Sequence, residues 1–298
     1  MGKKKTAYSF AGGGIKAYAQ IGILKYLEEV NVHAQAFAGT SMGSLVAAFS
    51  ACGCSASNIE KYMLEIEEHI IKHRLLKPSS AQVFPLLKND ASGLISPAKF
   101  VDILSKQLIK CGSHTLDDLK YPLIVNAVDL NSGKTVLFTN IKNKNHAFKD
   151  YILVHDATIV EALQASCSFP MVFETMMWRD YQLVDGGVMM NAPVFPLKQA
   201  GFDPILSMTM GVQSDYHTTT KILDIASRVI EIMINEADAM AIRHADLNIN
   251  AFDKEIGIFT FGKGKDAIQL GYDVAKAHHD EIIAFKEKSR TSWLELFK

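Results

Sequence analysis

Short apolar runs alternate with helix-like segments along almost the whole chain, and this alternation constrains the fold more than any other feature. Strand-like runs occur at 7–10, 34–38, 123–128, 135–139, 171–175, 182–184 and 205–210. Helical periodicity lies between and after them, most clearly at 222–242 and 266–285. This order favours an α/β protein in which helices cover a mostly parallel sheet. We therefore expect a three-layer sandwich with a central sheet flanked by helices.

Local signals refine this prediction. Ser57 with Glu60 three residues later forms a capping box and predicts a helix start. The sequence at 130–135 predicts a hairpin turn between two strands. The segment 77–96 is rich in Pro, Ser and Asn, and is either a surface connection or a mobile cover over a site. Because no repeat or composition break divides the chain, we expect one domain over 1–298.

Composition argues against several classes of protein. The 31 basic and 32 acidic residues give a net charge of -1, so we expect no nucleic acid partner. The four cysteines show no metal-ligand spacing, and we expect no metal and no cofactor. The uncharged stretch 36–57 contains a turn and is interpreted as core. Glycines and Lys16 interrupt the apolar N-terminal stretch, so we expect a cytoplasmic location rather than export.

The sequence Gly39-Thr40-Ser41-Met42-Gly43 has the G-x-S-x-G pattern and lies between a strand-like run and an apolar helical run. In this context the pattern predicts a sharp turn that exposes a serine hydroxyl at the end of a strand. The amide of Met42 would then point toward the group that Ser41 attacks. The alternative is an ordinary turn with Ser41 as a helix cap.

A second turn follows the first strand, with Gly12, Gly13 and Gly14 in succession. The spacing also satisfies the dinucleotide fingerprint, but the acidic residue expected after the second strand is replaced by the sequence around Ala38. Free amides in such a loop bind an anion, which is either a nucleotide phosphate or the oxyanion of an acyl transfer reaction. Lys16 adds a positive charge for a phosphate head group, or is a solvated helix residue.

A serine nucleophile needs a base, and the chain offers two kinds. Asp185 ends an apolar strand and is followed by Gly186 and Gly187, which allow close approach of the backbone. Taken alone, such an aspartate is most often a turn residue. Among the later histidines His217 is the best candidate for a Ser-His-Asp arrangement, and both kinds of base remain open at this point.

Three stretches in this order, GGGIK, GTSMG and DGG, resemble the motifs of the patatin-like phospholipase family. Further similar stretches are ALQASCSFPMVF, NAPV and AIQLGYDVAKAH, so the resemblance covers nearly the whole chain. It implies one patatin-like acyl hydrolase domain with Ser41 as nucleophile, Asp185 as base and a glycine-loop oxyanion hole. Ala17 departs from the family's usual glycine, but alanine suits a first helical turn and we expect the loop to keep its shape.

The leading hypothesis is therefore a serine lipid acyl hydrolase that cleaves carboxylic esters of fatty acids without a cofactor. The resemblance also implies transient contact with a membrane surface. Methionines between 171 and 210 are expected to fill the core or to line an acyl-chain pocket. The alternatives are a Ser-His-Asp α/β-hydrolase esterase and a non-catalytic nucleotide-binding α/β protein.

Overall fold

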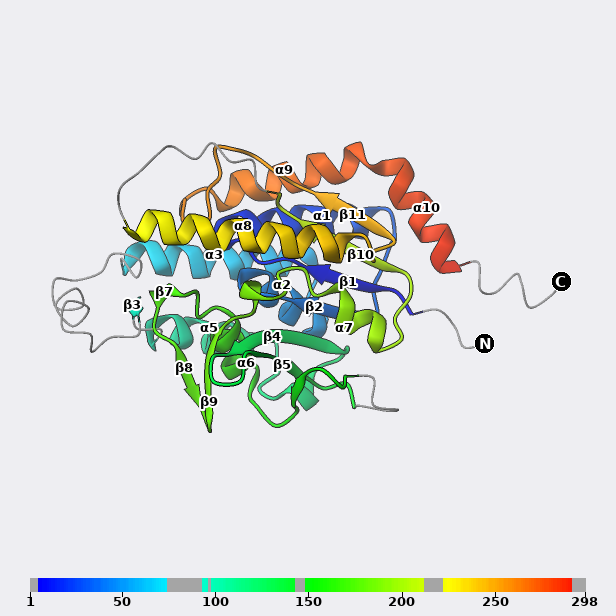
Figure 1. Ribbon diagram of the computed structural model, residues 1–298. Helices are drawn as coiled ribbons and strands as arrows, with labels where there is room; N and C mark the ends of the chain where they lie inside the picture. The colour runs from blue at the N-terminus through cyan, green and yellow to red at the C-terminus, as the bar shows by residue number, and fades with distance from the viewer. Residues whose placement is uncertain (1–4, 74–92, 96–97, 143–147, 212–221, 291–298) are drawn as a thin grey trace.

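The structure is a computed structural model that describes residues 5–73, 93–95, 98–142, 148–211 and 222–290 (Figure 1). Its strands are β1 (Ala7–Phe10), β2 (Ala36–Gly39), β3 (Gly93–Ile95), β4 (Leu123–Asp129), β5 (Lys134–Thr139), β6 (Ile152–Val154), β7 (Met171–Phe173), β8 (Met176–Trp178), β9 (Tyr181–Asp185), β10 (Ile205–Thr209) and β11 (Leu247–Asn250). Its α-helices are α1 (Ala19–Glu29), α2 (Met42–Cys52), α3 (Ala56–Lys72), α5 (Ala98–Lys110), α6 (Ile159–Ser166), α7 (Val194–Gln199), α8 (Ile222–Ile242), α9 (Gly264–Ala277) and α10 (His279–Arg290).

A mostly parallel sheet forms the centre of the molecule, in the order β11-β10-β1-β2-β4-β5-β6. The pairings of β1 with β2 and β10 are parallel, as is the pairing of β2 with β4. β5 and β9 run antiparallel to β4, and β8 runs antiparallel to β9. β1 therefore lies inside the sheet, and the loops that follow β1 and β2 emerge side by side at one edge.

Helices cover this sheet on both faces and produce three layers. α2 packs on β1, β2 and β4 and contacts α1 and α3, and α9 packs along α1. α7 packs on β1, β2 and β10, and α8 packs against α7 (Figure 1). All residues of β1, β2, β4 and β10 are buried, as expected for strands covered on both faces. The predicted three-layer α/β fold is confirmed.

Several local predictions hold and others fail. The turn at 130–135 joins the antiparallel strands β4 and β5, as predicted. The capping box at Ser57 is wrong, because α3 begins at Ala56 and the Ser55 side chain caps it by accepting from the Asn58 amide at 3.3 Å. The single helix predicted at 266–285 is also wrong, because the chain leaves helical geometry at His278.

This break redirects the end of the chain. α9 packs along α1, whereas α10 turns toward β11. The expected cover at 77–96 lies outside the described residues, except that 93–95 forms β3, which pairs with β7. Within the described part of the chain, no helix is both long enough and apolar enough to cross a membrane.

Candidate active site

Ser41 occupies a strained turn between β2 and α2. Its backbone has φ 52° and ψ -130°, a conformation that residues other than glycine rarely adopt. Strained backbone of this kind is typical of a residue held in place for function. Glycines make the turn this tight, since a Cβ on Gly39 would lie 2.5 Å from the Gly43 carbonyl oxygen. A Cβ on Gly43 would collide with the carbonyl oxygen of Ala11 at the end of β1. The turn therefore places Ser41 beside the loop that follows β1.

Buried polar groups hold this turn in position. The Ser41 amide donates to Ser166 Oγ at 2.8 Å. Thr40 Oγ1 donates to Asn126 Oδ1 at 2.6 Å, and Asn126 Nδ2 donates to the Met190 carbonyl at 2.7 Å. Met190 lies in the loop that follows Asp185, so these bonds connect that loop with the serine turn through Asn126 of β4.

Asp185 ends β9 and is almost inaccessible, with 2% of its surface exposed. Its Oδ1 accepts a hydrogen bond from the Gly187 amide at 2.8 Å, whereas Oδ2 is buried and bonds to no described residue. Burial raises the pKa of the carboxyl to about 6, and the Ser41 hydroxyl and the Gly187 amide partly oppose this increase. The hydroxyl thus lies close to the carboxyl without a formed bond to Oδ2, as is common before substrate tightens a site.

The glycine loop presents amides to the same region. No acceptor is found among the described residues for the amides of Gly13 and Gly14, whereas Gly12 donates to the Asn191 carbonyl at 3.4 Å. Gly14 has φ 57°, and a Cβ there would strike the carbonyl oxygen of Ile258. That same carbonyl accepts the Ile15 amide at 3.0 Å. The Ile258 carbonyl therefore supports the glycine loop, and the amides of Gly13 and Gly14 are left to bind an anion.

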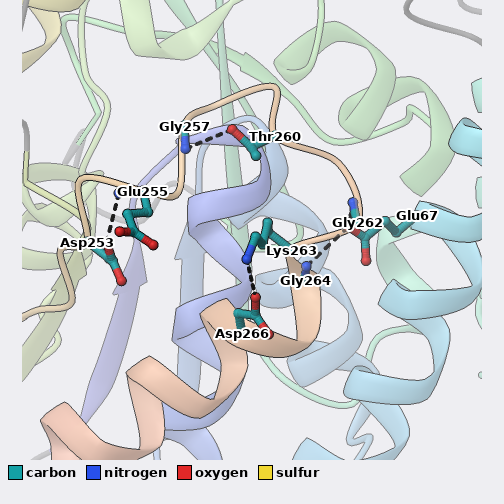
Figure 2. A network of polar contacts seen from close by, with 9 residues as sticks. All are labelled: Glu67, Asp253, Glu255, Gly257, Thr260, Gly262, Lys263, Gly264 and Asp266. Atoms are coloured by element: carbon teal, nitrogen blue, oxygen red, sulfur yellow. Dashed lines mark hydrogen bonds and ion pairs between the residues drawn. The ribbon is translucent and has the colours of Figure 1, made fainter.

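Ile258 belongs to the loop between β11 and α9, and hydrogen bonds attach this loop to α3. Figure 2 shows Glu67 of α3 facing the amides of Gly262 and Gly264, which donate to Glu67 Oε1 at 2.6 and 3.1 Å. Gly257 donates to Thr260 Oγ1 at 3.0 Å within the loop. The Glu67 side chain is buried, and a buried carboxylate requires partners such as these amides.

The predicted catalytic and glycine-loop residues line one pocket, whose empty space, including the open solvent at its mouth, is about 1070 Å³. Gly12, Gly13, Gly14, Lys16, Ser41, Met42 and Asp185 all contribute to its wall. The supporting glycines Gly39, Gly43, Gly186 and Gly187 lie behind the wall, with Gly186 packed against Asn126. Most of the remaining lining is apolar and includes Ile70, Phe100, Phe169, Phe173, Phe259 and Phe261.

Lys16 is part of this wall and is not an ordinary solvated lysine. Its Nζ lies 5.7 Å from the centre of the Phe252 ring, close enough for a cation-π contact. Burial lowers its pKa, and the charge of Glu231 partly opposes that change. The ammonium is therefore partly desolvated at the pocket wall.

Three residues of the site were not predicted from the sequence. Asp238 of α8 lines the pocket, and its Oδ2 accepts a hydrogen bond from Asn191 Nδ2 at 2.8 Å. Burial raises the pKa of Asp238 to about 6, against the opposing hydrogen bond from Asn191. Cys167 is buried beside the serine, and burial and the charge of Asp185 raise its thiol pKa. Asn191 and Cys167 had a signal, because they belong to the NAPV and ALQASCSFPMVF stretches, whereas Asp238 had none.

The residues that line the pocket also bear on the predictions made for the methionines and the histidines. Of the methionines between 171 and 210, Met210 lines the pocket, and phenylalanines supply most of its apolar surface. Among the described histidines none lines it, and His217 lies outside the described residues. The described residues contain no group of three or more His, Cys, Asp or Glu arranged to hold a metal ion.

The fold and pocket together define a class of protein, an α/β protein with a serine turn, a buried carboxyl and a glycine loop at one sheet edge. Within this class, the chain belongs to the patatin-like phospholipase family, whose model matches residues 8–198.

Individual relatives are distant. The uncharacterized protein YqhO of Bacillus subtilis is 26% identical over 209 residues, which is 67% of this chain and 69% of that protein. The uncharacterized NTE family protein Rv1063c of Mycobacterium tuberculosis is 24% identical over 206 residues, and the match spans 69% of this chain and about half (49%) of that protein. The crystal structure of VipD from Legionella pneumophila aligns over 95% of this chain and 67% of that one, with 12% identity and a TM-score of 0.48.

Proposed function

We propose that this chain is a serine lipid acyl hydrolase that cleaves carboxylic esters of fatty acids with a Ser41-Asp185 dyad. One observation carries the proposal. The strained Ser41, the buried Asp185 carboxyl and the free amides of the glycine loop all line a single, mostly apolar pocket. Membership of the patatin-like phospholipase family supports lipid hydrolysis as the type of reaction.

The reaction begins with ionised Asp185. Its carboxylate takes the proton of the Ser41 hydroxyl while Oγ attacks the ester carbonyl carbon. The amides of Gly13, Gly14 and Met42 stabilise the oxyanion, with Gly12 holding the loop through its bond to Asn191. Asp185 then gives the proton to the departing alcohol, which leaves an acyl-serine.

The second half repeats these steps with water. Asp185 accepts a proton from water as the water oxygen attacks the acyl carbon. The intermediate collapses, Ser41 regains its proton, and the free fatty acid leaves. A pKa near 6 suits Asp185 to this role, because it makes the carboxylate a stronger base while leaving it mostly ionised at neutral pH.

The pocket favours a substrate with a long apolar chain. Its phenylalanine-rich wall offers apolar contacts to a fatty acyl group, whereas polar groups of the wall include Ser41, Lys16 and Asp185. Exposed apolar side chains of the pocket wall and of α8, a helix that contributes to that wall, support transient contact with a membrane surface. They are Phe259 and, on α8, Ile225, Val229, Ile232, Met233 and Met240.

Labelling with a fluorophosphonate tests the proposal. We expect a covalent adduct on Ser41, located by peptide mass spectrometry, and no adduct in Ser41→Ala. Asp185→Asn should lose turnover of fatty acyl esters, whereas His217→Ala and His244→Ala should keep it. Loss of activity in a histidine variant together with activity in Asp185→Asn would favour a Ser-His-Asp esterase. An unlabelled protein that binds a nucleotide saturably would favour the nucleotide-binding alternative.

A further inference from the structure

Three cysteines gather at the end of α2 that lies away from Ser41, and we call Cys52, Cys54 and Cys111 the thiol cluster. Cys52 ends α2, Cys54 follows Gly53, and Cys111 follows α5. The sulfurs of Cys54 and Cys111 are 3.2 Å apart, although the residues are separated by 57 positions in the sequence. All three thiols are free and half-buried, and none lines the candidate active-site pocket.

Hydrogen bonding within the thiol cluster favours a thiolate beside a thiol. Cys54 and Cys111 are hydrogen-bonded through their sulfurs, and the contact with Cys111 lowers the pKa of Cys54 and of Cys52. The same contacts raise the pKa of Cys111, so that it remains the protonated partner. A thiolate is the form of cysteine that reacts with peroxides, and a neighbouring thiol can then complete a disulfide.

We propose that the thiol cluster is an oxidation site at which a peroxide converts Cys54 and Cys111 into an intramolecular disulfide. The Cys54 thiolate attacks one peroxide oxygen and breaks the O–O bond, which gives a sulfenic acid and a hydroxide or alkoxide that takes up a proton. The Cys111 thiol, after losing its proton, attacks the sulfenic sulfur and expels hydroxide, which leaves as water. Two thiols are thus oxidised by two electrons in total, and the peroxide is reduced.

The two sulfurs need to move about 1 Å closer to form the bond. A disulfide requires the two sulfurs to approach to about 2.05 Å, and both residues lie in connections beyond helix ends. Cys52 is a second neighbour of Cys111 and becomes its partner when Cys54 is absent. Cys111 is therefore the shared member of either disulfide.

Cys167 provides a matched control within the same chain. It is buried in the pocket wall, and burial and the charge of Asp185 keep its pKa high. A thiol of this kind is protonated and unreactive. It should take no part in the oxidation of the thiol cluster.

The test is a thiol titration of the whole protein before and after treatment with hydrogen peroxide, followed by peptide mapping. Wild type should lose one pair of its four thiols and yield linked peptides of Cys54 and Cys111, and dithiothreitol should restore the pair. Cys167→Ser should lose the same pair from its three thiols and yield the same linked peptides of Cys54 and Cys111. Cys54→Ser should instead link Cys52 to Cys111, and Cys111→Ser should form no disulfide.

Thermal denaturation supplies a second measurement. A disulfide across 57 positions restricts the unfolded chain, so oxidation should raise the melting temperature of wild type by several degrees but not that of Cys111→Ser. The proposal would be overturned by a disulfide between any other pair in wild type, or by a disulfide in Cys111→Ser after the same treatment. Neither readout depends on ester hydrolysis, so the result is independent of the proposed function.

Discussion

Replacing Asp185 with asparagine should make the folded protein more stable at alkaline pH while it removes catalytic turnover. In the native state burial raises the pKa of this carboxyl from 3.8 to about 6. Its ionisation therefore costs more in the folded protein than in the unfolded chain. The difference in pKa corresponds to about 3 kcal/mol of lost stability at pH 8. Asparagine carries no charge and can still accept the bond from Gly187.

The pH dependence gives this prediction its sign. A carboxyl with a raised native pKa contributes stability below its unfolded pKa and loses that contribution as the pH rises through about 4 to 6. Asp185→Asn should therefore exceed wild type by up to about 3 kcal/mol at pH 8 and by about half of that at pH 5. Urea denaturation followed by circular dichroism at both pH values measures the difference.

A matched control separates this effect from a general change of charge. Asp180 is exposed in the turn between β8 and β9, and Asp180→Asn should leave stability nearly unchanged at both pH values. The reasoning about Asp185 is refuted if Asp185→Asn is no more stable than wild type at pH 8. It is also refuted if the gain in stability does not shrink at pH 5.

Four further outcomes follow from the pocket and its supports. The kcat/KM of wild type for a soluble ester should rise about tenfold from pH 5 to pH 7 as Asp185 ionises, and a profile that stays flat down to pH 4 would contradict this. Gly12→Ala should lower kcat at least about tenfold, because the new Cβ would lie 2.5 Å from Asn191 Oδ1 and displace the oxyanion loop; an unchanged kcat would argue against that loop. Asp238→Asn should be more stable than wild type in urea at pH 8, because it removes the charge of a carboxyl whose pKa burial raises to about 6 and keeps an oxygen for the Asn191 amide; Asp238→Ala removes that oxygen and should be about 1–3 kcal/mol less stable than Asp238→Asn, whereas equal stability of the two variants would show that the bond to Asn191 contributes nothing. Glu67→Ala should raise KM for long-chain esters, because it removes the hydrogen bonds that hold the loop carrying Phe259, and Glu67→Gln should have a smaller effect. Unchanged kinetics in Glu67→Ala would show that substrate binding does not depend on these bonds.

The sequence predicted features whose causes are local. The serine turn requires glycines at 39 and 43 because backbone atoms approach them closely, and that requirement is visible as a pattern. The strands with continuous apolar runs were also predicted, since burial on both faces leaves a clear signal. β6 and β8 have only three residues each, and β11 contains only two apolar residues, so none of them stands out as an apolar run.

Features that depend on tertiary contacts could not be predicted. Glu67 meets the Gly262 amide across 195 positions, and Asp238 of α8 reaches Asn191 across 47 positions. In each case a polar residue on a helix has the same appearance in sequence as a solvated one. The break at His278 was missed for a related reason, because amphipathic periodicity continues from α9 into α10 while their packing partners differ.

The order of strands in the sheet has a consequence for synthesis of the chain. When Asp185 has left the ribosome, both members of the proposed dyad exist, but β1 still lacks its neighbour β10. The Ala11 amide has no Met208 carbonyl to bond, and the Ile15 amide has no Ile258 carbonyl. The glycine loop therefore reaches its final shape only after translation has passed residue 258, so a nascent chain that already holds the serine and the aspartate still lacks the completed glycine loop on which the proposed oxyanion site depends.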